Sequence, residues 1–257
     1  MKQGVYIYFI GTAGSGKSTL TSTMHSWFNL HGLDSVIVNL DPGAENLPYK
    51  PDVDIRDWIS LREVMEEYRL GPNGAQIACA DMLALNTDDV KKSIESFKSD
   101  YILVDTPGQL ELFVFREAGK YTVKFLSPEY SVICYLIDPA LARSPSGFVS
   151  QLLLSVNTNF RLGQPHVNVL TKSDLLSDDD RMIIKKWSYD PDELYGAVVH
   201  EQPSVYREMS EHIVRLLRDL GGYTNLIFTS KEDLIGMDDI YTHVQMLFSG
   251  GEDTSKD

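Results

Sequence analysis

The chain has 257 residues, a formal net charge of -14 and two cysteines, Cys79 and Cys134. Its length suits one α/β domain with insertions, or at most two small domains. The negative charge opposes general binding to nucleic acid or anionic lipid, and the lack of a Cys-x-x-Cys pair argues against zinc or a redox dithiol and for free buried thiols.

The apolar runs of the sequence are short. The runs Val5–Ile10 and Val132–Ile137 fall far below the ~20 residues of a membrane span. The first is interrupted by tyrosines and is too short for the apolar region of a secretory signal peptide. We therefore expect a soluble, cytoplasmic protein with neither membrane nor direct nucleic-acid partners.

Short runs rich in Val, Ile, Leu and Tyr alternate with helix-compatible stretches. The predicted strands are Val5–Ile10, Val36–Asn39, Tyr101–Asp105, Val132–Asp138, Val167–Thr171 and Asn225–Thr229. The predicted helices between them include Lys17–His31, Ser144–Asn159 and Ser204–Leu220. The alternation predicts an α/β fold with a doubly wound, mostly parallel sheet, helices on both faces and helical insertions. Ligands of such sheets bind beyond the carboxyl ends of the strands.

We expect one domain over residues 1–249, with insertions at about 45–80 and 178–203. The first insertion contains a predicted helix, Arg56–Tyr68, and then Gly71-Pro72-Asn73, a tripeptide that alone predicts only a turn. The second insertion opens on an acidic triplet and lies before Pro203. Residues 250–257 are predicted to form a disordered tail.

The first predicted strand ends in the strongest motif of the chain. The sequence GTAGSGKS at Gly11–Ser18 matches G-x-x-x-x-G-K-[ST] and joins a strand to a helix, as a P-loop requires. Its glycines let backbone N–H groups reach phosphate oxygens, and the helix that follows adds free N–H groups. Lys17 can reach the β and γ phosphates, and the Ser18 hydroxyl can bind Mg²⁺. The predicted phosphate-binding residues are Gly14, Ser15, Gly16, Lys17, Ser18 and Thr19.

The second predicted strand ends in Asn39-Leu40-Asp41-Pro42. Parallel strands end at one edge of a sheet, so Asp41 should face the P-loop. Its carboxylate is predicted to contact Mg²⁺ or to act as a base for water. An Asx-type turn before Pro42 is the alternative interpretation.

The third predicted strand ends in Asp105-Thr106-Pro107-Gly108-Gln109. An acid at a strand end beside a P-loop has the Walker B position, which holds Mg²⁺. The Gly108 N–H is predicted to bind the γ-phosphate, and Gln109 and Glu111 to orient the attacking water. Alone, Asp-Thr-Pro-Gly would predict only a turn.

Two later segments indicate the base. Thr171-Lys172-Ser173-Asp174 follows the fifth predicted strand, where the Asp174 carboxylate could accept from both N1–H and the 2-amino group of guanine. Adenine offers an acceptor at N1 and no amine, so such a site should reject it. A helix-capping Ser-Asp pair is the alternative. Ser230-Lys231, after the last strand, is predicted to lie near the guanine O6.

Together these motifs resemble the GPN-loop GTPases, which are related to the signal recognition particle and MinD-type proteins. The resemblance covers about residues 4–248, and Gly71-Pro72-Asn73 is its distinctive element; Thr171 replaces the Asn of the usual N-K-x-D motif. It implies a homodimer in which the tripeptide of one subunit, with Asn73, acts in trans on the nucleotide of the other. It also implies a switch between GTP and GDP states that is read by a protein client, which the sequence does not name.

The residues predict a magnesium-dependent hydrolysis of GTP to GDP and phosphate. Ser18, Asp41 and Asp105 would hold Mg²⁺, while Lys17 neutralises phosphate charge. Arg116 is expected to form a surface ion pair, so no residue supplies an arginine finger, which raises turnover by roughly 10³–10⁵ where present. Slow intrinsic turnover follows.

Four alternatives stay open at this point. An assembly or partitioning ATPase is one alternative, and Asp174 argues against it because its carboxylate matches guanine. A small-molecule P-loop kinase would need an acceptor pocket and an arginine-rich lid. A nickel-insertion GTPase would need Cys or His near the P-loop, where His25 and His31 look like surface or packing residues. A non-enzymatic scaffold that only holds nucleotide would not need Gln109 or Glu111.

Selectivity between the two purines separates these alternatives. Because Asp174 matches the donors of guanine, we expect phosphate release from GTP to exceed release from ATP under the same conditions. A phosphate-release assay with both nucleotides checks this expectation. Faster ATP turnover would contradict the guanine site and favour a partitioning ATPase.

Overall fold

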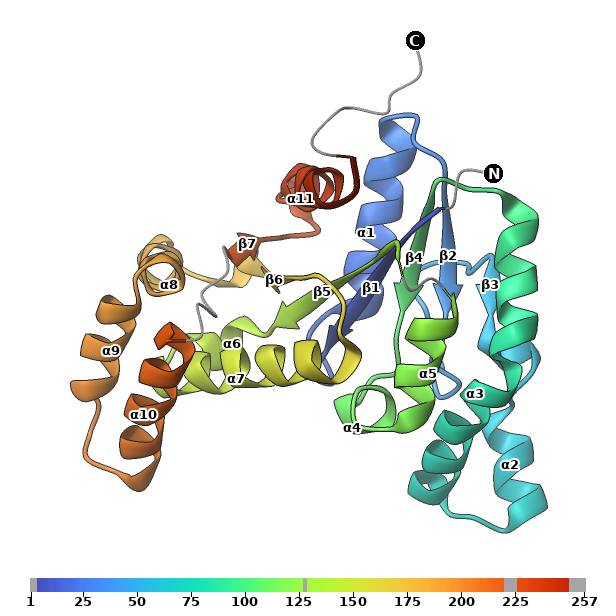
Figure 1. Cartoon of the computed structure of the whole chain (residues 1–257), viewed down its shortest axis with the longest axis horizontal. Helices are drawn as coiled ribbons and strands as arrows, with labels where there is room; N and C mark the ends of the chain where they lie inside the picture. The colour runs from blue at the N-terminus through green and yellow to red at the C-terminus, as the bar shows by residue number, and fades with distance from the viewer. Residues whose placement is uncertain (1–3, 127–128, 220–225, 250–257) are drawn as a thin grey trace.

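A computed structural model describes residues 4–126, 129–219 and 226–249 of the chain (Figure 1). Within them, seven strands form one sheet in the order β3-β2-β4-β1-β5-β6-β7, and every neighbouring pair is parallel. The strands are β1 (Val5–Gly11), β2 (Ser35–Asn39), β3 (Val53–Asp54), β4 (Tyr101–Asp105), β5 (Ser131–Ile137), β6 (His166–Leu170) and β7 (Leu226–Phe228). The predicted doubly wound parallel sheet is confirmed.

Helices cover both faces of this sheet. They are α1 (Lys17–Leu30), α2 (Leu61–Tyr68), α3 (Pro72–Phe97), α4 (Leu110–Phe113), α5 (Glu117–Leu126), α6 (Pro139–Ala142), α7 (Pro145–Leu162), α8 (Asp178–Tyr189), α9 (Pro191–Val199), α10 (Val205–Asp219) and α11 (Met237–Ser249). In Figure 1, α1 and α11 lie on one side of the strands, and α3, α4, α5 and α7 on the other.

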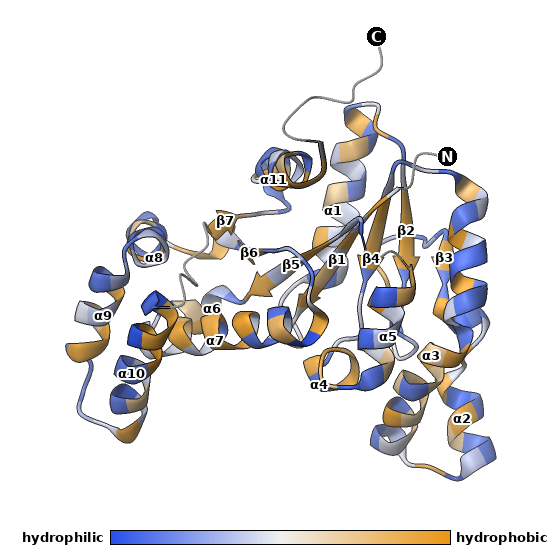
Figure 2. Cartoon of the chain, in the orientation of Figure 1, coloured by the Kyte–Doolittle hydropathy of each residue, from blue (hydrophilic) through white to orange (hydrophobic). Residues whose placement is uncertain are grey.

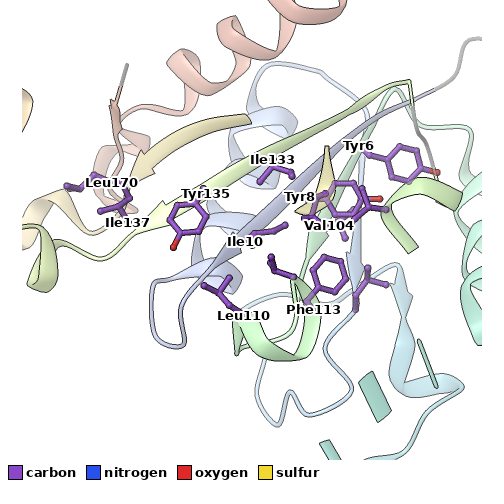
Figure 3. Close-up of a cluster of buried hydrophobic side chains, with 14 of the residues drawn as sticks. Tyr6, Tyr8, Ile10, Val104, Leu110, Phe113, Ile133, Tyr135, Ile137 and Leu170 are labelled. Atoms are coloured by element: carbon purple, nitrogen blue, oxygen red, sulfur yellow. The ribbon is translucent and has the colours of Figure 1, made fainter. Parts of the chain in front are cut away.

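The apolar core divides into two layers because side chains alternate along each strand. On β1, Tyr6, Tyr8 and Ile10 face the larger layer, shown in Figure 3 with neighbouring residues from β4, β5 and α4. Ile7 and Phe9 face the smaller layer, which packs against α1 and α11. The strands are mostly apolar, whereas the helices carry mixed polar and apolar surfaces (Figure 2). This pattern is typical of a sheet buried on both faces.

Strand register sets the positions of the predicted site residues. β1 lies at the centre of the sheet, between β4 and β5. The strands β2, β3 and β4 lie on one side of β1, and β5, β6 and β7 lie on the other side. Phe9 pairs with Asp105, and Asn39 also pairs with Asp105. The ends of β1, β2 and β4 therefore meet at one edge, at the topological switch point where α/β sheets bind ligands.

The first insertion differs from the prediction. The expected helix Arg56–Tyr68 is interrupted: a 3₁₀ turn covers Ile55–Asp57, and α2 begins at Leu61. The unpredicted strand β3 pairs with β2, and the Asp54 side chain at its end accepts from the Arg56 N–H and caps the turn. The Ser60 side chain then caps α2 by accepting from the Glu63 N–H. Each side-chain cap begins a separate helical segment, so the Asp54 and Ser60 caps explain why the predicted helix is interrupted.

The Gly71-Pro72-Asn73 segment is also not an isolated turn. Pro72 is the first residue of α3, a helix of 26 residues that runs to Phe97. Proline suits this position because the first helical N–H has no partner within the helix. The expected insertion boundary at about residue 80 therefore falls inside α3.

The other expected elements agree with the structure within a few residues. Predicted ends at Leu220 and Asn225, and the predicted tail over 250–257, lie outside the described residues. Cys79 and Cys134 are free and buried, as expected. In the described part of the chain, no helix combines the length and apolar character needed to span a bilayer.

Two helical glycines give opposite predictions for the same substitution. A Cβ on Gly119 in α5 would lie 2.0 Å from the Phe113 carbonyl oxygen, whereas a Cβ on Gly196 in α9 would meet nothing within 4 Å. Alanine normally stabilises a helix interior by roughly 0.5–1 kcal/mol over glycine. We expect urea unfolding to show a gain of that size for Gly196→Ala and a loss of more than ~1 kcal/mol for Gly119→Ala. A gain at both positions would show that α5 can shift away from α4.

Candidate nucleotide site

The P-loop forms a tight anion-binding turn between β1 and α1. Gly14 and Gly16 have φ angles of +77° and +95°, a region that glycine adopts without strain. No side chain caps the start of α1. Its free N–H groups and positive dipole end therefore face the loop, which is the arrangement that binds phosphate.

Lys17 lies at the centre of this arrangement and is only 6 % exposed. Its Nζ donates to the carbonyl oxygens of Gly11, Thr12 and Gly108, each at 2.9 Å. Burial lowers the pKa of Lys17, and the nearby carboxylates of Asp105 and Asp41 oppose this shift. The lysine is thus held at the phosphate-binding turn by backbone acceptors that phosphate oxygens can replace.

Asp105, at the end of β4, is 1 % exposed. Its Oδ2 accepts from the Tyr49 hydroxyl at 2.5 Å. Burial raises the pKa of Asp105 to about 6, while hydrogen bonds from the Ser18 and Tyr49 hydroxyls and the charge of Lys17 act in the opposite direction. The other oxygen, Oδ1, is buried without a hydrogen-bond partner among the described residues.

This unpartnered oxygen fits a magnesium site. A buried carboxylate oxygen is costly to leave unpaired, and hydrated Mg²⁺ would satisfy it. The described residues contain no cluster of three or more His, Cys, Asp or Glu side chains that could hold a metal. Mg²⁺ does not need one, because it binds through one or two protein oxygens, its own waters and substrate phosphates. Ser18 and Asp105 would supply that donor set.

Asp41 makes the Asx-type turn and also a longer-range contact. Its Oδ1 accepts from the Gly43 N–H at 2.9 Å, and its Oδ2 accepts from the Gly108 N–H at 3.0 Å. Burial raises the pKa of Asp41, and these two N–H groups lower it. The Gly108 N–H, which the sequence predicts to bind the γ-phosphate, therefore donates to Asp41 in this conformation. In this conformation, Asp41 faces backbone amides.

A cavity of about 180 Å³ lies beside Asp41 at the P-loop end nearest Gly108. It is lined by Ala13, Asp41, Pro42, Gly43, Gln76, Ala80, Pro107, Gly108, Gln109 and Leu112. Of the residues predicted to act on water or the γ-phosphate, Gln109 lines this cavity, whereas Glu111 and Asn73 are exposed and do not line it. Sequence reasoning missed Gln76, one turn into α3, because no motif includes it.

A second cavity, of about 260 Å³, lies at the other end of the P-loop. It is lined by Gly16, Thr19, Leu20, Thr23, Thr171, Lys172, Asp174, Leu175, Thr229, Ser230 and Lys231. The two predicted guanine segments are therefore brought together beside the start of α1. The cavities flank the P-loop, as the base and the γ-phosphate of one nucleotide would require.

Side-chain contacts hold the guanine segments to the P-loop. The Thr171 hydroxyl donates to the Ser15 carbonyl oxygen at 2.6 Å, so the residue that departs from N-K-x-D anchors its motif. Lys172 donates to the Gly14 carbonyl oxygen at 2.5 Å and pairs with Asp138 at 3.3 Å. Asp138, at the end of β5, had no role in the sequence prediction.

Asp174 is oriented by the last loop. The Ser230 hydroxyl donates to Asp174 Oδ1 at 2.6 Å, and the Ser173 N–H donates to the Thr229 carbonyl oxygen at 3.0 Å. Because Ser230 binds one carboxylate oxygen, the orientation of the Asp174 side chain is restricted where it lines the cavity. Lys231 lines the same cavity but is itself exposed.

Residues that the sequence placed outside the site are found in structural roles. Arg116 forms the expected ion pair, with Asp81. The His25 ring bonds to the Ser35 hydroxyl at 2.9 Å, and the His31 ring stacks on Trp27 with 4.0 Å between centroids.

The fold and this site define a P-loop nucleoside-triphosphatase. A family model described as "Conserved hypothetical ATP binding protein" matches residues 9–250. The GPN-loop GTPase QQT1 of Arabidopsis thaliana is 34% identical over 88% of this chain and 79% of its own length. The corresponding figures for GPN-loop GTPase 3 of Kluyveromyces lactis are 35%, 84% and 82%. The crystal structure of PAB0955, a GTPase in apo form from Pyrococcus abyssi, superposes with a TM-score of 0.85 at 29% identity, covering 95% of this chain and 97% of that one.

The chain belongs to the GPN-loop GTPase family. The family resemblance predicted from the order of its motifs is therefore confirmed.

Burial of Asp105 predicts a pH-dependent stability. The folded-state pKa is about 6, against an ordinary value of 3.8, so between these values the folded protein binds more protons than the unfolded chain. Stability from this group is therefore highest at acidic pH and falls as the pH rises through about 6. Asp105→Asn should raise the free energy of unfolding of nucleotide-free protein at pH 7 by up to roughly 3 kcal/mol, at ~1.4 kcal/mol per pKa unit.

Urea unfolding of wild type and Asp105→Asn, without nucleotide or Mg²⁺, measures this difference across pH. The two curves should converge near pH 4, where the wild-type carboxyl is protonated in the folded protein. An asparagine variant less stable than wild type at pH 7 would show that attraction between Asp105 and Lys17 outweighs burial.

Proposed function

We propose that this protein binds Mg²⁺·GTP, hydrolyses it to GDP and phosphate, and acts as a dimeric switch for a protein client. One observation carries this proposal. Two cavities flank a single P-loop, one lined by the guanine residues and the other by the segment that follows Asp105. A nucleoside triphosphate is the ligand whose base and γ-phosphate are separated in this way.

The base assignment rests on Asp174. The description of the family names ATP, whereas the relatives are named GTPases. The Asp174 carboxylate, which Ser230 holds, can accept from N1–H and the 2-amino group of guanine. Adenine would place an acceptor, N1, against this carboxylate, and the two acceptors would repel each other. Buried polar groups left without their partners reject a ligand by several kcal/mol. GTP is therefore the substrate that the site favours.

The same contacts suggest how the residues act in hydrolysis. Lys17 exchanges its carbonyl partners for phosphate oxygens, and Asp41 releases the Gly108 N–H to the γ-phosphate. Ser18 and Asp105 would hold Mg²⁺, which would supply charge neutralisation for the phosphates. Gln109, which lines the γ-phosphate cavity together with Asp41, orients water for in-line attack, whereas the exposed position of Glu111 does not support the role predicted for it. No arginine lines the γ-phosphate cavity among the described residues, which favours slow intrinsic turnover.

The position of Asn73 supports action in trans. Asn73 is exposed and does not line the γ-phosphate cavity of its own chain, although Gln76, from the same helix, does. The corner between α2 and α3 lies at the periphery of the molecule (Figure 1). A second copy could therefore present this corner to the nucleotide, so that GTP hydrolysis and dimer geometry are coupled.

Mixing two inactive variants tests this arrangement. Lys17→Ala removes the phosphate-binding amine, and Asn73→Ala removes the proposed trans contact. A mixed dimer retains one nucleotide site with Lys17 intact and Asn73 supplied by the partner. We expect each variant alone to lose GTP turnover at least tenfold. Their equimolar mixture should recover up to about a quarter of wild-type turnover, because mixed dimers form half of the population and carry one working site each.

Phosphate release at fixed total protein measures the recovery, with a size tag on one variant so that sizing detects the mixed dimers. Mixing Lys17→Ala with wild type should give half of wild-type turnover whether or not subunits exchange, so it provides the control for inhibition by the variant subunit. An inactive mixture of exchanging subunits would contradict action in trans.

A further inference from the structure

The carboxylate that faces the magnesium position is held by a residue outside every motif of the sequence. Tyr49 lies in the segment between β2 and β3, and its hydroxyl donates to Asp105 Oδ2 at 2.5 Å. This contact joins residues 56 positions apart. It uses one of the two carboxylate oxygens and leaves Oδ1 as the buried oxygen without a partner among the described residues.

The surroundings of Tyr49 are strongly negative. Burial and the charges of Asp105, Asp54 and Asp41 raise the pKa of Tyr49, with burial the largest cause. A neutral phenol that donates its proton is therefore stable here, and ionised phenol is not. In the contact with Asp105, the Tyr49 hydroxyl is the donor and Asp105 Oδ2 is the acceptor.

The segment that carries Tyr49 is fixed at both ends. The Asn39 side chain accepts from the Asp41 N–H at 3.0 Å and donates to Asp54 at 2.9 Å, so it ties the start of the segment to β3. The Asp52 side chain accepts from the Ile37 N–H at 2.8 Å. A donor on such a segment can set the orientation of a carboxylate, whereas one on a free loop would follow it.

We propose that Tyr49 is a positioning residue for magnesium: it binds Oδ2 of Asp105 and so directs Oδ1 toward the metal. This inference rests on the proposed magnesium-dependent function. Ligating carboxylates are commonly hydrogen-bonded from behind, and loss of such a partner typically lowers metal affinity by about 10–100-fold. The structure assigns that role to Tyr49.

The test separates magnesium binding from nucleotide binding. The dissociation rate of fluorescently labelled GDP is measured for wild type and Tyr49→Phe over a range of free Mg²⁺ and in EDTA. We expect the Mg²⁺ concentration for half-maximal slowing to rise about tenfold or more in Tyr49→Phe. The rate in EDTA should match wild type, because Tyr49 lines neither cavity.

Tyr135→Phe provides the matched control. The Tyr135 hydroxyl is buried and has no hydrogen-bond partner in the described part of the chain, so its removal should leave both measurements unchanged. Thermal unfolding confirms that each variant is folded.

Three results would overturn the inference. An unchanged Mg²⁺ midpoint would show that Asp105 does not need Tyr49, and a lower midpoint would show that Tyr49 competes with the metal. Faster release in EDTA by the same factor as in Mg²⁺ would show a general structural role. A wild-type protein insensitive to Mg²⁺ would instead contradict the magnesium site of the proposed function, and the inference with it.

Discussion

Burial of the Lys17 ammonium group is the constraint on which the site depends. A buried cation is stable only where acceptors surround it, and Lys17 has three carbonyl oxygens within hydrogen-bond distance. Two come from the end of β1 and the P-loop, and the third comes from Gly108, beyond the end of β4. The lysine therefore requires β1 and β4 to be neighbours in the register that the sheet provides. The same register brings Asp105 close enough to oppose the loss of the lysine proton.

The polar groups around Lys17 explain why this edge is suited to binding and poorly suited to stability. Burial disfavours the charged form of Asp105 more than its partners favour it. Its pKa is raised in spite of two hydroxyl donors and a nearby cation. The pKa of Asp41 is likewise raised by burial, although the Gly43 and Gly108 N–H groups donate to its carboxylate. Both carboxyls would gain from additional positive charge nearby. Local violations of the usual stability rules are expected at functional sites, and here they coincide with the predicted place of a metal-bound triphosphate.

Much of the fold could be predicted because the signals are local. The strand that precedes the P-loop and the strand that ends at Asp105 are continuous apolar runs with a polar stop, and each occurs within one residue of its predicted bounds. The predictions that were wrong lie in the first insertion. β3 has only two residues, too few for a periodic pattern. A proline that opens α3 gives the same local signal as a proline in a turn.

The sequence also predicted where the chemistry lies but not its supporting residues. Lys17, Ser18, Asp105 and Asp174 occur in motifs whose spacing reflects how a backbone wraps phosphate or ends a strand. Tyr49 and Gln76 belong to no motif. A single tyrosine among prolines, or a glutamine on a long helix, has many possible environments, and only the folded chain selects one of them.

The sequence by itself predicted the class of ligand, the strand ends at its site and the residues proposed to touch phosphate and base, because those features depend on consecutive residues. Only the tertiary structure decided which groups pair across the site. The Gly108 N–H meets Asp41 across 67 positions, Tyr49 meets Asp105 across 56, and Ser230 meets Asp174 across 56. Such pairs depend on strand order and register, which are set by packing of the whole sheet between its helices, and no short stretch of sequence contains that information.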